Sequence, residues 1–191
     1  MTTKGAITEH APAKINLSLH VTGQREDGYH LLDSLVMFTA IGDLITVSPA
    51  DTLALTIDGP FADGLTADRD NLVLGAARSF GTDMGAAITL TKNLPVASGI
   101  GGGSADAAAT LRALSRLWNL PIPDLHTQLA LGADVPVCMT PDLSRMEGIG
   151  DQITRISAMS DTNLILINPG VGVYSSHRLQ CFVEQTKPEN E

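Results

Sequence analysis

Four of the five residues at positions 99–103 are glycines, in a loop that runs from Ser98 to Ser104 at the start of an expected helix. Glycine allows positive φ angles and lets backbone N–H groups approach a ligand without interference from a Cβ atom. A helix N-terminus adds unpaired N–H groups and a positive dipole, so the pattern favours a cradle for an anion such as phosphate. The alternative is a flexible turn before a tight helix start, which needs fewer glycines.

The loop fits neither of the two commonest phosphate motifs. A Walker A loop has a lysine directly before the first Ser or Thr of the helix, and here Gly103 precedes Ser104. A dinucleotide-binding loop ends on a glycine and follows a strand at once. This loop ends on Ser104, and residues 93–98 separate it from the preceding strand. The sequence therefore predicts a less usual phosphate cradle.

Lys14 and Asn16 are two residues apart in a segment where apolar and polar residues alternate. Because side chains two apart on a strand point to the same face, the pair could bind an anion or a polar substrate together. The alternative is an ordinary solvated strand face.

Asp134 lies between an expected helix end and the apolar residues Val135 and Pro136, with no oppositely charged neighbour in sequence. An aspartate in such a place is often a cap or a turn former. It is a general base if it lies in a partly desolvated pocket with a lysine close by. Local sequence leaves both interpretations open.

Tyr29 and His30 follow Asp27 and Gly28 in a polar turn. Both rings are suited to stack on a flat group such as a nucleobase. Taken alone, the turn is more typical of an ordinary surface loop.

Hydrophobic periodicity predicts an α+β fold, with strands first and then a mixture of helices and strands. Strands are expected over residues 10–23, 31–41, 44–48, 53–57, 87–92 and 163–168. A helix over 72–80 is expected to be capped by Asp70 or Asn71, and one over 125–131 to be closed by Gly132. The clearest helix covers 104–118, with Ser104 as its N-cap and Asp106 in its first turn.

The 191 residues carry 12 Lys and Arg against 21 Asp and Glu, which gives a net charge of −9. This balance argues against a nucleic-acid binder or a polybasic membrane protein, but it leaves room for a local pocket for a phosphorylated small molecule. With 43% apolar residues, no secretory signal and no apolar run that could span a bilayer, the sequence predicts a cytoplasmic protein with a core of its own. Cys138 and Cys181 are expected to be reduced, buried thiols.

Three segments together resemble the GHMP kinases closely: APAKINLSLHVTGQREDGYHLLDS at 11–34, LPVASGIGGGSADAAATLRAL at 94–114 and LGADVPV at 131–137. The second segment fits the superfamily in general. The first is typical of the members that act on a cytidine-diphosphate derivative of methylerythritol in isoprenoid synthesis. RMEGIGD at 145–151 and LINPGVGV at 166–173 extend the resemblance, so that it covers residues 10–175.

This resemblance implies a kinase that transfers the γ-phosphoryl group of ATP, accompanied by Mg²⁺, to the 2-hydroxyl of a small cytidine-diphosphate substrate. It makes Asp134 the base that accepts the hydroxyl proton and Lys14 the cation beside it. It assigns Asn16, Tyr29 and His30 to the substrate. It assigns the ATP phosphates to ten residues, of which Ser104 is also the candidate Mg²⁺ ligand: Pro95, Val96, Ala97, Ser98, Gly99, Ile100, Gly101, Gly102, Gly103 and Ser104.

The resemblance also implies a two-domain architecture, with an N-terminal domain like domain 2 of ribosomal protein S5 at 1–160 and the start of a C-terminal domain at 161–191. Nothing after Val183 resembles the glycine-rich motif that the family carries in its C-terminal domain, and residues 174–179 depart from the family's Ser/Pro-Thr-Pro stretch. Two other functions stay open: a catalytically silent nucleotide-binding protein shortened at its C-terminus, and a GHMP kinase for another small-molecule alcohol. The sequence makes no prediction of the oligomeric state.

Overall fold

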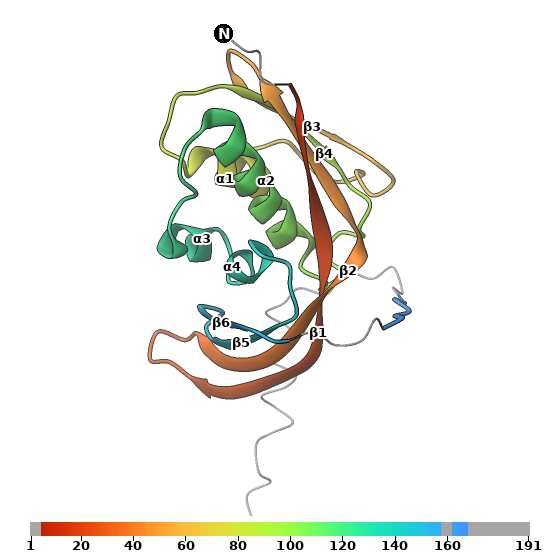
Figure 1. The fold of residues 1–191 in the computed structure, drawn as a ribbon, viewed down its shortest axis with the longest axis vertical. Coiled ribbons are helices and arrows are strands. Elements are labelled where there is room, and N and C mark those ends of the chain that lie inside the picture. The colour runs from red at the N-terminus through yellow and green to blue at the C-terminus, as the bar shows by residue number, and fades with distance from the viewer. Residues whose placement is uncertain (1–4, 158–161, 168–191) are drawn as a thin grey trace, which may run out of the picture.

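A mixed sheet organised around one long strand is the frame of the protein in the computed structural model, which describes residues 5–157 and 162–167 (Figure 1). That strand, β2 (His30–Pro49), pairs along one edge with β1 (Ile7–Gln24). Its other edge pairs with β4 (Ala86–Thr91) at one end and with β5 (Ser144–Gly148) at the other, all antiparallel. The sheet is completed by β3 (Leu53–Asp58), which runs parallel to β4, and β6 (Gln152–Arg155), which pairs with β5.

The continuity of β2 corrects the sequence prediction of separate strands over 31–41 and 44–48. Gly42 lies between those two runs, and a Cβ atom there would be 2.5 Å from the carbonyl oxygen of Ala11 on β1. Glycine at this position marks a close approach of two strands instead of a turn. The first part of the chain therefore forms three strands and not four.

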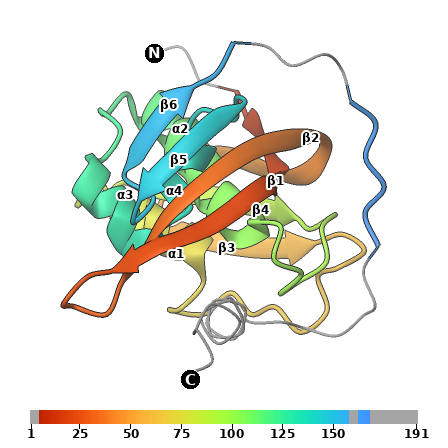
Figure 2. The same ribbon diagram turned by 90° about the horizontal axis from the view of Figure 1, so that it is seen from below.

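The helices are α1 (Leu72–Arg78), α2 (Gly102–Trp118), α3 (Leu125–Leu131) and α4 (Val135–Cys138), and α2 packs against β1 and β2 (Figure 2). The helix α2 buries one face against the sheet, and its alanines allow it to lie close to the strands. At the far end of α2, the Trp118 ring meets the Phe80 ring edge to face, with the centroids 5.3 Å apart. The core combines side chains of α2 with those of the sheet: Ala107, Ala108, Leu111 and Leu114 with Val36, Ile45, Val47 and Ile88.

The start of α2 differs from the prediction. The helix begins at Gly102 and not at Ser104, and its N-cap is Gly101, whose φ of 68° lies in the left-handed region that favours glycine. No side chain caps this end, so Ser104 is not the N-cap. A helix that starts two residues earlier brings two further glycine N–H groups into its first turn.

Local sequence pattern correctly predicts one boundary each of α1 and α3. The N-cap of α1 is Asn71, one of the two candidates, and Gly132 ends α3 as predicted. The strand predicted over 163–168 is wrong for its described part, because 162–167 form no strand and the side chains of Ile165 and Ile167 are 89% and 88% exposed. No prediction was made for α4, although Pro136 near its start is a common helix-start signal.

Several predictions lie wholly or mostly outside the described residues, among them Cys181, the 174–179 segment and most of the second domain from 161 onwards. Cys138 is buried with a free thiol, and burial raises the pKa of this thiol to about 12. It is therefore an unreactive core thiol. Among the described residues, no helix is long and apolar enough to cross a membrane.

A single guanidinium group joins three of these elements. Arg112 on α2 donates from Nε to the Glu9 carboxylate (3.0 Å), from one terminal nitrogen to the His10 carbonyl (2.8 Å) and from the other to the Cys138 carbonyl (2.8 Å). Glu9 and His10 belong to β1, and Cys138 is the last residue of α4. Arg112 thus holds β1 and α4 at fixed positions against α2.

Replacing Arg112 by Met is expected to lower the free energy of unfolding by about 2–3 kcal/mol, because three charge-assisted hydrogen bonds are lost from a largely buried group. Arg116→Met is the matched control, since Arg116 pairs with the same Glu9 but its side chain is 62% exposed. The control is expected to cost less than about 1 kcal/mol. Urea unfolding of both variants provides the comparison, and equal losses would contradict the role given to Arg112.

Candidate active site

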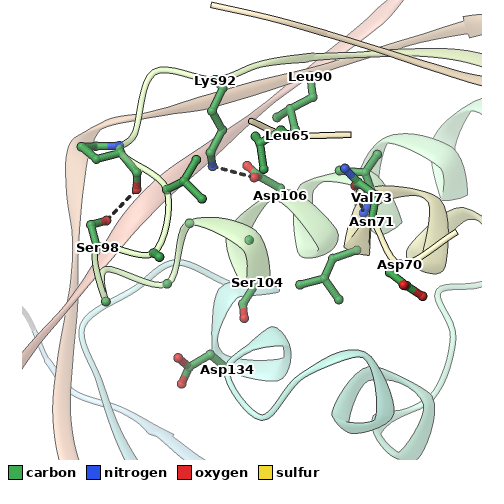
Figure 3. A pocket seen from close by; sticks show the side chains of 18 residues that line it. Leu65, Asp70, Asn71, Val73, Leu90, Lys92, Ser98, Ser104, Asp106 and Asp134 are labelled. Carbon is green, nitrogen blue, oxygen red and sulfur yellow. Dashed lines mark hydrogen bonds and ion pairs between the residues drawn. The ribbon is translucent and has the colours of Figure 1, made fainter. Parts of the chain in front are cut away.

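The glycine loop lines a cavity of about 420 Å³ between the start of α2 and the segment that leads into α1 (Figure 3). Nine of the ten predicted phosphate-loop residues line it, and Ile100 is the exception. The Ile100 carbonyl points instead to β1, where it accepts a 2.8 Å hydrogen bond from the backbone N–H of Lys14. The opposite walls are formed by the residues Leu65, Asp70, Asn71, Leu72, Val73, Leu90, Lys92, Asp106 and Asp134.

The loop has a backbone conformation that turns it around the cavity. Ala97, Gly99 and Gly101 all have positive φ, at 54°, 73° and 68°. The Ser98 hydroxyl donates to the Pro95 carbonyl (2.7 Å) and closes the first turn of the loop. Consecutive left-handed and right-handed residues before a helix start turn backbone N–H groups towards a common point, which is the geometry of an anion site.

Lys14 and Asp134 meet at the edge of this cavity. The Lys14 Nζ atom lies 3.1 Å from Asp134 Oδ1, although 120 positions separate the two residues in sequence. Lys14 is 4% exposed, so it does not lie on a solvated strand face. Asp134 occupies the N-cap position of α4, but its side chain makes no capping hydrogen bond. Of the two interpretations that the sequence left open for Asp134, the structure favours a carboxylate directed at a lysine.

Two other predicted residues lie beside this pair. Asn16 accepts a 3.0 Å hydrogen bond from Lys14 Nζ at its Oδ1 atom. Ser104, in the first turn of α2, lines the cavity, and its side chain points towards the Asp134 side (Figure 3). Among the described residues, no group of three or more His, Cys, Asp or Glu side chains is arranged to hold a metal ion. Ser104 lies in the cavity wall, and its role as a metal ligand stays a prediction.

Tyr29 and His30 are not among the residues that line the cavity. They lie where the β1–β2 hairpin turns, and the Tyr29 side chain is 59% exposed. The turn is stabilised by Asp27, whose carboxylate accepts a hydrogen bond from the Tyr29 N–H (3.3 Å). The structure thus brings Lys14, Asn16, Asp134 and the glycine loop together, and it presents Tyr29 and His30 separately at the hairpin tip.

Lys92 is a cavity residue that sequence reasoning missed. Its Nζ atom is buried between two carboxylates, Asp106 at 2.8 Å and Asp43 at hydrogen-bond distance. Asp43 also accepts from the backbone N–H groups of Asn93 (2.6 Å) and Leu94 (2.8 Å), where the loop begins. No local signal marked Lys92, because its partners lie 49 and 14 residues away.

The structure also corrects the role of Asp106, which does not lie in the first turn of α2 facing the helix dipole. Burial raises the pKa of the Asp106 carboxyl to about 7, against the opposing effect of Lys92, and Asp43 adds to the increase. The Lys92 ammonium has a raised pKa because the two carboxylates outweigh its burial. Asp106 Oδ1 is buried without a hydrogen-bond partner in the described part of the chain, as suits a group that is partly protonated near neutral pH.

The raised pKa of Asp106 predicts a pH-dependent stability. The folded protein binds more protons at this carboxyl than the unfolded chain between about pH 4 and 7, so its contribution lowers the free energy of unfolding as the pH rises. Asp106→Asn is expected to remove a decrease on the order of 3 kcal/mol over this range. Chemical unfolding at several pH values measures it, with Asp142→Asn as the exposed control. An unchanged slope in the Asp106 variant would contradict the assignment.

Comparison with known proteins agrees with the fold and the motifs. Residues 71–156 match the family model described as GHMP kinases N terminal domain. This part of the chain is therefore similar to the N-terminal domain of the GHMP kinases. Together with the observed sheet and helices, this confirms the α+β fold that hydrophobic periodicity predicts.

The chain is also similar to proteins named 4-diphosphocytidyl-2-C-methyl-D-erythritol kinase. It is 62% identical to the one from Ruegeria pomeroyi over 168 residues, which are 88% of this chain and 60% of the relative. It is 56% identical to the one from Paracoccus denitrificans, covering 94% of this chain and 62% of the relative. A crystal structure of 4-(cytidine 5'-diphospho)-2C-methyl-D-erythritol kinase superposes with a TM-score of 0.64 at 34% identity, over 79% of this chain and 55% of that one. The chain spans about three fifths of the length of these curated relatives.

Proposed function

We propose that the protein is an ATP-dependent kinase that phosphorylates the 2-hydroxyl of 4-diphosphocytidyl-2-C-methyl-D-erythritol, in the nonmevalonate route to isopentenyl diphosphate. The observation that carries this proposal is the ion pair of Lys14 and Asp134 at 3.1 Å, at the edge of a cavity lined by a glycine loop and a helix start. A phosphoryl transfer needs an anion cradle, a cation and a base that lie in reach of one another. The names of the relatives support the choice of substrate.

ATP would occupy the cavity from one end to the other. The N–H groups of the loop and of the first turn of α2 would bind its phosphates. The base would lie against the apolar side chains at the other end, which are contributed by Leu65, Leu72, Val73 and Leu90. Mg²⁺ in nucleotide sites is commonly held by one or two protein oxygens together with phosphate oxygens. The Ser104 hydroxyl suits this role, and the ion would neutralise charge on the transferred group.

The Lys14–Asp134 pair would carry the proton and charge changes of the reaction. Asp134 accepts the proton of the substrate hydroxyl, and the resulting oxygen forms a bond to the γ-phosphorus of ATP. The bond between that phosphorus and the bridging oxygen of the β-phosphate breaks, and ADP leaves. The Lys14 ammonium stabilises the negative charge of the carboxylate and of the transferred phosphoryl oxygens.

The cytidine part of the substrate would lie nearer the hairpin. Tyr29 is an exposed aromatic side chain, and stacking of a base on it would remove apolar surface from water. His30 is its neighbour at the start of β2, and Asn16 lies between this region and the cavity as a substrate-side amide. We further propose that residues 1–160 form the N-terminal domain and that 161–191 begin the next one.

A coupled assay of ADP release with the cytidine-diphosphate substrate tests the proposed function. Turnover is expected with this substrate and not with mevalonate or homoserine. Asp134→Asn is expected to lower kcat by about 10²–10⁴-fold, as is usual for the loss of a general base. Asp142→Asn is a matched control, because that carboxylate is exposed and paired with Arg155. Turnover of mevalonate or homoserine in preference would favour a different GHMP kinase, and no turnover above the Asp134→Asn level would favour a silent protein.

The role of Tyr29 predicts a selective loss of substrate affinity. Tyr29→Ala is expected to raise the KM for the cytidine-diphosphate substrate about 5–100-fold, the usual effect of losing one base–aromatic stack. The KM for ATP is expected to stay within about twofold, because Tyr29 does not line the cavity. Ile122→Ala removes another exposed apolar side chain and controls for surface effects. Equal KM values for the substrate in the Tyr29 variant and the wild type would exclude the stacking role.

A further inference from the structure

Ser34 on β2 is a fully buried polar residue next to the candidate active site. Its hydroxyl donates to the Ser18 carbonyl oxygen (2.7 Å), and it lies 2.7 Å from the side-chain amide nitrogen of Asn16. In many proteins a buried hydroxyl does no more than satisfy a neighbouring carbonyl. Whether Ser34 affects the active site therefore depends on what its two contacts impose on Asn16.

The contacts of Ser34 determine the orientation of the Asn16 amide. A serine hydroxyl has one hydrogen, and a carbonyl oxygen only accepts, so the hydrogen of Ser34 is used on Ser18. Ser34 can therefore only accept a hydrogen bond from Asn16, which must present its NH₂ group to Ser34. The Asn16 carbonyl oxygen then faces the other way, where it accepts the hydrogen bond of Lys14 Nζ at 3.0 Å. The flipped amide would place donors against the donors of an ammonium group.

A β-bulge brings these groups together. The register of β1 and β2 shifts between Asn16 and Ser18, so that Leu17 is an extra residue in β1. Asn16 is paired with Val36, and Ser34 is the diagonal neighbour on the same face of β2. Bulges of this kind redirect side chains beside active sites. Here the bulge directly follows Asn16, whose side chain contacts both Ser34 and Lys14.

The hydrogen bonds form one continuous chain that ends on the candidate base: Ser18 carbonyl, Ser34, Asn16, Lys14 and Asp134. We infer that Ser34 is a positioning residue of the kinase site, which fixes the Asn16 amide and through it holds the Lys14 ammonium within contact distance of Asp134. This inference rests on the proposed function. Without Ser34 the amide is free to rotate, and Lys14 loses a fixed acceptor for its ammonium group.

Steady-state kinetics of Ser34→Ala test the inference. The variant is expected to lower kcat about tenfold and to leave the KM for ATP within about twofold, because the glycine loop is unchanged. Ser144→Ala is the matched control: Ser144 is 1% exposed on the adjacent strand β5, and its hydroxyl donates to the Asp142 carbonyl at 3.0 Å. It is expected to leave kcat within about twofold of the wild type, by the same reasoning. Equal effects of the two variants on kcat would overturn the inference.

A double-mutant cycle separates positioning from general destabilisation. If Ser34 acts through Asn16, Ser34→Ala is expected to change kcat less than about twofold in an Asn16→Ala background. A change of this size is about the error of a double-mutant cycle. If instead the two substitutions lowered kcat by factors that multiply in the double variant, Ser34 would act by another route.

An NMR measurement keeps the test independent of kinase activity. In protein labelled with ¹⁵N-lysine, the Nζ resonance of buried Lys14, assigned through Lys14→Met, is expected to shift in Ser34→Ala and to stay in place in Ser144→Ala. If the wild type showed no turnover but this shift occurred, the proposed function would fail while the hydrogen-bond chain stood. An unmoved Lys14 resonance in Ser34→Ala would overturn the inference whatever the activity.

Discussion

The contact between the glycine loop and β1 is the constraint on which the rest of the site depends. The Ile100 carbonyl accepts the N–H of Lys14 at 2.8 Å, and a Cβ atom on Gly101 would lie only 3.0 Å from the Cβ atom of Lys14. Because Gly101 has no side chain, the start of α2 lies directly on the stem of Lys14. The N-terminus of the helix and the lysine ammonium therefore converge on the same space, and α4 places Asp134 next to both.

The charges around the cavity explain how a protein with a net charge of −9 could bind a polyanion. Lys92 lines the cavity, but two carboxylates already neutralise its charge, so its contribution is to hold the loop to β2 and α2. On the proposed function, the attraction for phosphate would come from backbone N–H groups and from Lys14, which shares its charge with one carboxylate. Such short-range attraction depends on the geometry of the loop and little on the net charge of the molecule.

The sequence predicts those parts of the site in which a residue's role follows from its own neighbours. The glycine loop, the common face of Lys14 and Asn16, and the cap at Asn71 are of this kind. Lys92 and Asp106 are not of this kind, because a buried ion pair between distant segments leaves no periodic pattern in the sequence. A helix that starts at Ser104 would have Asp106 in its first turn, but α2 starts at Gly102 and Asp106 lies beyond that turn. Residues 162–167 have the composition of a strand, but strand formation also requires pairing with another strand. In the part of the chain that the structure describes, these residues form no strand and are exposed. The roles of the site residues, and the division of the chain at residue 160, stay predictions.

The bulges of β1 connect the two separate groups of candidate residues. The register of β1 against β2 shifts three times, after Pro12, after Asn16 and after Val21, and each shift adds bend and twist to the paired strands. A straight hairpin of this length would carry Tyr29 directly away from Lys14. In both ribbon views the hairpin instead curves beneath β5 and β6, and its tip lies on the same side as α3 (Figures 1 and 2). If one ligand touches both groups, as the proposed function requires, it would be extended, with a flat ring at Tyr29 and an alcohol at Asp134. A nucleoside diphosphate joined to a small polyol has that shape, whereas mevalonate and homoserine do not.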